Sequence, residues 1–221
     1  MGGTAPPSDQ AGKSPIEKPA ILNVEGDRVA LGPLRRALLP LYQRWNNDFA
    51  TTRTTASSRP TTIEQEAAAY DRVTADASYA LFTIYDRATW QPIGLAYLAD
   101  IDYRNRSAEF GVVIGEAVFR GKGYGTETTR LVLDYAFTAL GLHNVVLTVA
   151  EFNLAGRRAC EKAGFKEIGR RRQCRQMGGR LWDSIYMECR ASKFTGAVQA
   201  RVFLPDAPRS PAGGPPAVTE P

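Results

Sequence analysis

The feature that most constrains this fold is an apolar strand that runs into a glycine-rich loop and then into a helix. The strand ends at residues 112–114, glycines stand at positions 121, 123 and 125, and an amphipathic helix follows. Glycines let backbone amides converge without obstruction by Cβ atoms, and the helix adds unpaired N–H groups and the positive end of its dipole. The stretch therefore predicts a cradle for an anion, most readily a phosphate or pyrophosphate.

Two common nucleotide-binding loops do not fit this stretch. A Walker loop needs Gly-Lys-Ser/Thr at the helix start, whereas Lys122 stands between glycines and Thr126 comes later. A Rossmann fingerprint needs G-x-G-x-x-G, and the spacing here is G-x-G-x-G. The pattern that fits is R-x-x-G-x-G, made by Arg120, Gly123 and Gly125. An ordinary glycine-rich turn is the alternative until the flanking sequence is considered.

Hydrophobic periodicity predicts an α/β fold with a mixed sheet. Apolar runs at 80–85, 93–101 and 107–114 are separated by short turns and indicate an antiparallel meander. The helix at 126–140 and the apolar strand at 144–150 add a βαβ unit, whose two strands lie parallel. The other predicted elements are a strand at 29–34, helices at 35–49 and 154–163, a helix capped by Thr62 with Gln65, and strands at 166–175 and 181–188.

A second motif follows the 144–150 strand and settles the family resemblance. Asn153 is followed by a helix that closes on Glu161-Lys162-Ala163-Gly164-Phe165. This motif and the R-x-x-G-x-G loop, in this order, resemble the two signatures of the GNAT acetyltransferase superfamily over about residues 28–190. The resemblance implies the GNAT fold, of α/β (α+β) class: a mixed, mostly antiparallel sheet of six to seven strands, splayed in the middle and flanked by about four helices.

Three further stretches resemble the RimJ/RimL and spermidine acetyltransferase-like branch. They are Trp45-Asn46-Asn47-Asp48, Ala108-Glu109-Phe110-Gly111 and the run 179–187. Membership in this branch implies an acetyl-CoA-dependent N-acetyltransferase, an acyltransferase that moves an acetyl group to a primary amine. The acceptor is left open between a polyamine, an aminoglycoside-like small molecule and a protein N-terminus. The alternative is a coenzyme A-binding module with little or no activity.

The resemblance also assigns the donor site. Backbone groups of the strand before the loop are implied to bind the pantetheine arm, amides of the loop the pyrophosphate, and Asn153 the coenzyme near its thiol end. A solvated loop charge is the alternative interpretation for the Arg120 and Lys122 side chains. For Asn153 the alternative is a helix cap, and we expect the residue to fill both roles at once. The implied coenzyme-binding residues are Val112, Val113, Ile114, Arg120, Gly121, Lys122, Gly123, Tyr124, Gly125, Thr126 and Asn153.

Two residues are candidates for the chemistry. Glu109 corresponds to a glutamate that this branch places in the acceptor pocket, where it takes a proton through water; the alternative is a strand-edge charge that faces solvent or pairs with Arg106. Many relatives carry a tyrosine acid where this chain has Cys160. A buried structural thiol is the alternative role for Cys160, and Tyr103 and Tyr186 are candidates for support.

Charged residues give two opposing indications about the acceptor. Acids on the acceptor-side segments suit a polycation; they are Asp48, Glu64, Glu66, Asp100 and Asp102. Against this, the arginines at 170–172, 175 and 180 make a basic hairpin, whose plainer interpretation is a solvated sheet edge. The alternative is a contact with an anionic carrier or a ribosomal surface.

Composition sets the outer limits. The 221 residues suit one domain at 21–190, with a disordered Gly/Ser/Pro-rich tail at 1–20 and an extended, Pro-rich tail at 191–221. A net charge of +5 is too small to indicate a nucleic-acid partner, and one histidine with three separated cysteines supplies neither a metal site nor a disulfide framework. No apolar run reaches bilayer length, so we expect a cytoplasmic protein without a membrane partner; a homodimer is expected by analogy alone.

Overall fold

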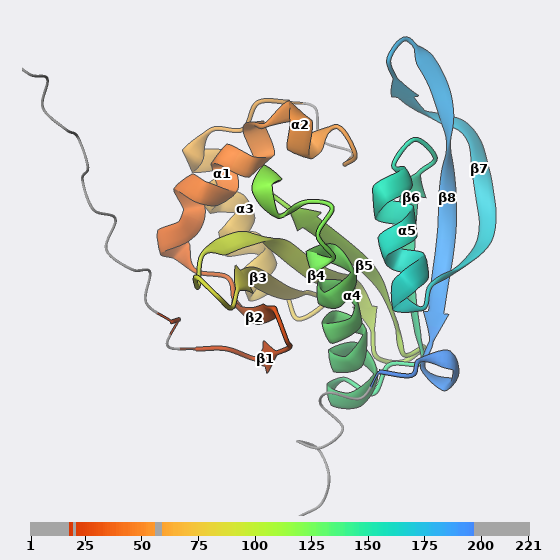
Figure 1. Ribbon diagram of the computed structural model, residues 1–221, viewed down its shortest axis with the longest axis horizontal. Helices are drawn as coiled ribbons and strands as arrows, with labels where there is room; N and C mark the ends of the chain where they lie inside the picture. The colour runs from red at the N-terminus through yellow and green to blue at the C-terminus, as the bar shows by residue number, and fades with distance from the viewer. Residues whose placement is uncertain (1–17, 20, 56–58, 197–221) are drawn as a thin grey trace, which may run out of the picture.

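The computed structural model describes residues 18–19, 21–55 and 59–196, and these residues form one mixed sheet (Figure 1). Its eight strands lie in the order β1-β2-β3-β4-β5-β6-β8-β7. Every neighbouring pair is antiparallel except β5 and β6, which are parallel. The strands are β1 (Val24–Glu25), β2 (Val29–Pro33), β3 (Ala80–Asp86), β4 (Pro92–Asp102), β5 (Ser107–Ile114), β6 (Asn144–Ala150), β7 (Lys166–Met177) and β8 (Arg180–Arg190).

The predicted meander, βαβ unit and closing hairpin are confirmed, but the strand count is higher than the six to seven expected. The extra strand, β1, has two residues, which is too short to leave a periodic pattern in the sequence. At the other end, Gly178 and Gly179 turn β7 into β8 with φ of 59° and 75°. Both values lie in the left-handed region that a tight two-residue hairpin turn requires.

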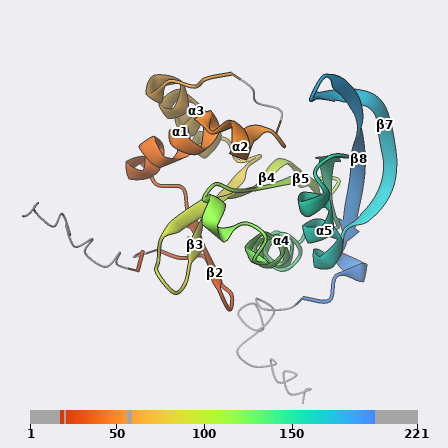
Figure 2. The ribbon, with the colours of Figure 1, turned by 45° about the horizontal axis from the view of Figure 1, so that its top comes forward.

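In the part of the chain that the structure describes, five α-helices cover the two faces of the sheet, where about four were expected. α1 to α3 lie on one face, and α4 and α5 lie side by side on the other (Figures 1 and 2). The predicted capping box between Thr62 and Gln65 begins α3. The α-helices are α1 (Leu39–Asn47), α2 (Phe49–Thr52), α3 (Ile63–Ala75), α4 (Tyr124–Asp134) and α5 (Leu154–Ala163).

Two predicted helices differ from the structure in their regularity. The helix expected at 35–49 is a 3₁₀ turn, then α1, then the separate short helix α2, because Asp48 takes an extended conformation and caps α2 with its side chain. The helix expected at 126–140 begins at Tyr124, and its last turn, Tyr135–Ala139, is a π-helix. Gly141, with φ of 63°, ends it as predicted.

Side-chain alternation along the sheet separates two apolar clusters. On β4, Ala96 and Leu98 face the main core beneath α4 and α5, whereas Leu95 faces a smaller cluster with Tyr42 and Trp45 of α1. Helix α1 is thereby fixed to the strands by aromatic packing. The main core holds most of the buried apolar residues, so it supplies most of the hydrophobic stabilisation.

The predicted splay in the middle of the sheet is confirmed. β5 pairs with β4 from Ser107 to Ile114, with a register shift at Ala108, but with β6 only through Ser107, Ala108 and Glu109. β6 in turn stays paired with β8 as far as Ala150. The two parallel strands therefore diverge, and one edge of β5 beyond Glu109 has no strand partner.

Packing extends slightly beyond the predicted end of the domain at residue 190. A 3₁₀ turn at Ala191–Lys193 follows β8, and the ring of Phe194 lies 5.4 Å from that of Phe137. Most of the two predicted tails, residues 1–17, 20 and 197–221, lies outside the described residues.

We expect Gly115→Ala to destabilise the fold because the Trp45 ring occupies the place of a Cβ. A Cβ built on Gly115 lies 2.3 Å from that ring, so the overpacked variant loses about 1–3 kcal/mol of unfolding free energy. Gly169→Ala is the control, since a Cβ there meets no atom within 4 Å. Urea denaturation checks both; equal stability of the two variants would contradict the packing of Trp45 on Gly115.

Candidate active site

The divergence of β5 and β6 opens a cavity of about 230 Å³. Its walls come from Phe110–Val113 of β5, Leu147–Ala150 of β6, the N-cap residue Asn153, and Gly156 and Cys160 of α5. In an antiparallel pair, alternate residues turn both backbone groups away from the partner strand. The free edge of β5 therefore presents backbone donors and acceptors of alternate residues to this opening, so the backbone groups of Val112, Val113 and Ile114 do not all face it, and Ile114 lies outside the cavity lining.

Arg120 fixes the end of β5, a role that the sequence did not suggest. Its Nε donates to the carbonyl of Ile114 at 2.9 Å, and its Nη2 donates to the carbonyl of Gly115 at 2.8 Å and to the Thr51 hydroxyl. Asp48 lies 3.8 Å away as the counter-ion. The guanidinium thus ties α2 to the strand end, and its side chain is half-buried.

The glycine-rich loop has the geometry of an anion cradle. Gly121 and Gly123 have φ of 72° and 89°, and Gly123 is the N-cap of α4. No side chain caps this helix, so its first amides are left for another acceptor. Lys122 is exposed between the two glycines, while Gly125 and Thr126 lie in the first turn of α4.

A charged pair braces this loop against the start of the sheet. Arg28 donates from Nη1 to the Lys122 carbonyl at 2.8 Å, and its Nε lies 3.2 Å from the Glu127 carboxylate. Glu127 also accepts from the backbone amides of Arg28 and Val29. The phenol of Tyr124 donates to Asp86 at 2.8 Å. The loop is therefore held in shape by protein contacts alone.

Glu109 stands at the mouth of the cavity, on the face opposite the main core. Its neighbours along the strand, Ala108 and Phe110, are buried, whereas Glu109 is exposed. The expected alternative pairing with Arg106 does not form; Arg106 donates to the Gly141 carbonyl at 2.7 Å. Glu109 is thereby available to a molecule in the cavity.

Tyr97 is a residue of this site that sequence reasoning missed. It pairs with Gly111 across β4 and β5, and its ring covers the place where a Gly111 Cβ would stand, 2.2 Å away. Burial, and secondarily the charge of Glu109, raises the pKa of Tyr97, so the phenol stays protonated at neutral pH. The sign of this contact in the sequence is Gly111, two residues after Glu109. The ring that occupies the space beside Gly111 comes from Tyr97 on another strand, so the sequence pattern did not identify it.

Asn153 and Cys160, which were both expected near the thiol end of the coenzyme, differ in their surroundings. Asn153 caps α5 by accepting from the Gly156 amide at 3.0 Å, so the cap is confirmed, and the residue also lines the cavity. Cys160 is buried, and this burial raises the pKa of its thiol to about 12. Because an ordinary thiol has a pKa near 8.5, Cys160 is a weak acid toward a thiolate leaving group. Within the described chain, Tyr103 and Tyr186 line neither this cavity nor the larger one beside it.

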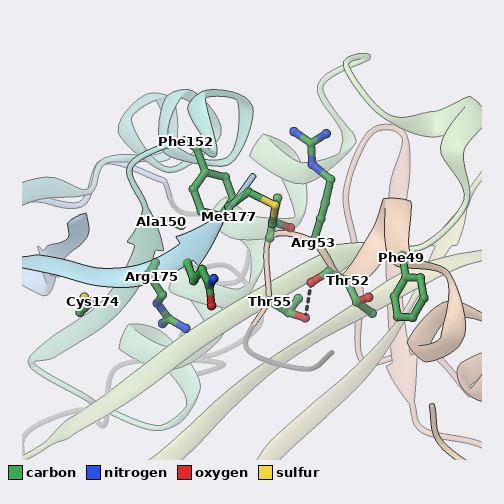
Figure 3. A pocket seen from close by; sticks show the side chains of 11 residues that line it. Phe49, Thr52, Arg53, Thr55, Ala150, Phe152, Cys174, Arg175 and Met177 are labelled. Atoms are coloured by element: carbon green, nitrogen blue, oxygen red, sulfur yellow. Dashed lines mark hydrogen bonds between the residues drawn. The ribbon is translucent and has the colours of Figure 1, made fainter. Parts of the chain in front are cut away.

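The larger cavity, of about 440 Å³, lies between α2 with its following loop and the tip of the β7–β8 hairpin (Figure 3). It shares Thr54, Thr55, Ala150 and Arg175 with the smaller cavity, so the two adjoin. Its full lining is Phe49, Thr52, Arg53, Thr54, Thr55, Ala150, Phe152, Cys174, Arg175, Gln176 and Met177.

The acids expected to hold a polycation do not line either cavity. Hydrogen bonds from Thr51 and the Ala50 amide lower the pKa of Asp48, which caps α2, and bonds from Asn105 lower that of Asp102 in its turn. Glu66 accepts from Asn46 at 2.9 Å. Glu64 and Asp100 are exposed outside both cavities.

The family is decided by sequence comparison over most of the domain. The family profile described as an acetyltransferase (GNAT) domain matches residues 28–166, which include both motifs and the splayed strands. The chain belongs to the GNAT acetyltransferase family. Its eight-stranded sheet with the opening between β5 and β6 is accordingly a GNAT fold, as the sequence motifs predicted.

Relatives within the GNAT family differ in their acceptors. A spermidine N(1)-acetyltransferase of Vibrio cholerae is 37% identical over 46% of this chain and 58% of its own length. The human alpha/beta-tubulin-N-acetyltransferase 9 is 30% identical over 65% of this chain and 74% of its own. The matched region thus spans little more than half of the first relative.

A solved structure supports the same family and fold. The crystal structure of spermidine N-acetyltransferase from Vibrio cholerae in complex with CoA and spermine superposes with a TM-score of 0.70. It is 29% identical in sequence, and the match covers 75% of this chain and 97% of the other.

In the described residues of this chain, no helix has the length and apolarity to cross a bilayer.

We expect Gly123→Ala to weaken coenzyme A binding because it strains the helix N-cap and presses on Arg28. A side chain at φ of 89° is disfavoured, and the new Cβ lies 2.8 Å from the Arg28 guanidinium. The loop amides shift to relieve this, which raises Kd by roughly tenfold. Gly141→Ala is the control, because Gly141 is also left-handed but lies away from the loop. We expect this variant to introduce similar backbone strain and to leave Kd unchanged. Calorimetry with coenzyme A that finds equal Kd values for both would refute the cradle.

Proposed function

We propose that the protein is an acetyl-CoA-dependent N-acetyltransferase of the RimJ/RimL and spermidine acetyltransferase-like branch. The observation that carries the proposal is the free edge of β5, which opens beside Glu109 at one end and leads to the glycine cradle at the other. An extended pantetheine arm pairs with such an edge as another strand would. The cradle supplies amides and a helix dipole for its pyrophosphate.

The donor half of the reaction uses backbone groups more than side chains. Among Val112, Val113 and Ile114, the residues whose backbone groups face the opening hold the pantetheine. Amides of the loop from Arg120 to Thr126 hold the phosphates, except that of Arg120, which donates to the Ala117 carbonyl. Gly121, Lys122, Gly123, Tyr124 and Gly125 belong to that loop. Asn153, fixed as the cap of α5, is the contact near the thiol end. Preformed donors of this kind need no reorganisation on binding.

The acceptor amine attacks the thioester carbonyl directly. The new N–C bond forms, the C–S bond breaks, and coenzyme A leaves as a thiolate that takes a proton from water. The ammonium proton passes to Glu109, through water, and then to solvent. An amide of β5 near Val113 stabilises the oxyanion. Tyr97, held protonated beside Glu109, is a neutral hydrogen-bond donor at the same mouth.

A second candidate function is a coenzyme A-binding module with little activity, which the buried thiol at Cys160 favours. Thiol release from acetyl-CoA, measured with a panel of polyamines, aminoglycosides and N-terminal peptides, separates the two. Release with at least one amine supports the enzyme. Coenzyme A binding by calorimetry without turnover on any amine would support the module.

We expect Glu109→Gln to reduce turnover and leave coenzyme A binding unchanged. Loss of a proton acceptor lowers kcat by roughly a hundredfold, while the backbone groups that hold the coenzyme stay in place. Glu64→Gln, an isosteric change at an exposed carboxylate outside both cavities, is the control. Steady-state kinetics with the best amine of the panel check this, and equal kcat values for the two variants would remove Glu109 from the mechanism.

We expect Cys160→Ala to leave the shape of the pH–rate profile unchanged. Because the pKa of Cys160 is about 12, its thiol stays protonated below that pH and contributes no ionisation near neutrality. The matched control is Cys189→Ala, where burial raises the thiol pKa to about 11. Both variants are expected to lose about 1–2 kcal/mol of stability through a small cavity. A tenfold fall in kcat confined to Cys160→Ala would instead assign it the acid role.

A further inference from the structure

The larger cavity carries a charge that the mechanism does not use. Two of its lining residues, Arg53 and Arg175, are cationic, and among the described residues that line it none is acidic. Arg53 reaches it from the segment after α2 and Arg175 from β7, on opposite sides of the opening (Figure 3). This cavity is electropositive and lies directly beside the mouth that holds Glu109.

Neither guanidinium is neutralised within the described chain. Arg53 and Arg175 take part in no salt bridge there, although other arginines of the same region do. Arg170, for instance, lies on β7 and contacts Glu167, Glu151 and Asp183, while Arg180 stacks on Trp182 at 3.8 Å. Arg175 is half-buried, so its charge is screened less than that of an exposed side chain.

Three charged side chains follow one another from the smaller cavity to the larger one. Glu109 lines the smaller cavity, Arg175 lines both, and Arg53 lines the larger one. A molecule with an amine at one end and an anionic group at the other matches this order. A polycation would place positive charge against both arginines, and a like-charge contact disfavours it.

We propose that the acceptor is an amine that also carries a carboxylate, with the amine toward Glu109 and the carboxylate toward Arg175 and Arg53. The inference rests on the proposed function, since it names the substrate class of that same site. Guanidinium groups bind carboxylates with paired, charge-assisted hydrogen bonds. The cavity of about 440 Å³, with Phe49, Phe152 and Met177 on its walls, has room for an amino acid or the first residues of an acidic peptide.

Matched amines test the preference. Serine against serinamide isolates the carboxylate of a free amino acid. The C-terminally amidated dipeptides Ser-Glu, Ser-Gln and Ser-Lys isolate a side-chain carboxylate, and spermidine stands for the polycations. We expect kcat/KM to be at least tenfold higher either for serine than for serinamide or for Ser-Glu than for Ser-Gln. The first result would indicate a small-molecule acceptor, and the second a peptide acceptor.

Variants of the two arginines locate the recognition. Arg175→Gln is expected to lower kcat/KM for the preferred carboxylated amine by roughly tenfold, mainly through KM, and to leave the uncarboxylated partner unchanged. Arg175→Glu reverses the preference toward the lysine dipeptide. Arg172→Gln, at an exposed arginine of β7 outside both cavities, is the control.

The outcomes separate this inference from the proposed function. Turnover with spermidine that exceeds turnover with every carboxylated amine would overturn the inference and leave the acetyltransferase standing. Loss of coenzyme A affinity in Arg175→Gln would assign the arginine to the donor site and overturn it too. Failure of all amines to release thiol would refute the proposed function, and the inference with it.

Discussion

The site depends on one limit to strand pairing. β5 is paired with β4 as far as Ile114, and β6 with β8 as far as Ala150, yet only three residue pairs join β5 to β6. Backbone groups beyond Glu109 are left without a strand partner in the middle of a sheet, where an unsatisfied group is costly. A ligand with amide groups of its own supplies what the missing strand does not.

The surroundings keep this opening in place without a ligand. Arg120 ties the end of β5 to α2, and the Trp45 ring closes over Gly115 at the same point. On the other flank, Arg28 and Glu127 hold the glycine loop against the first strands. These contacts come from segments far apart in the chain, so the donor site is built into the packing of the domain.

Local patterns in the sequence predicted most of the fold, and long-range pairing explains what was missed. The meander, the capping box at Thr62 and the glycine-ended helix α5 follow from residue spacing and capping chemistry. The role of Arg120 did not follow, because its partner Thr51 lies 69 residues away. Of the acids expected to bind a polycation, Asp48 caps a helix and Asp102 accepts hydrogen bonds within a turn, and neither lines a cavity.

Hydrogen–deuterium exchange of the whole protein, with and without saturating coenzyme A, tests the central claim most directly. Binding along the free edge of β5 and in the cradle predicts slowed amide exchange at 110–114 and 120–126, because those amides gain acceptors. The tip of the β7–β8 hairpin, residues 174–177, is predicted to exchange at the same rate in both states. Protection confined to that tip, with none at 110–114 or 120–126, would contradict the account.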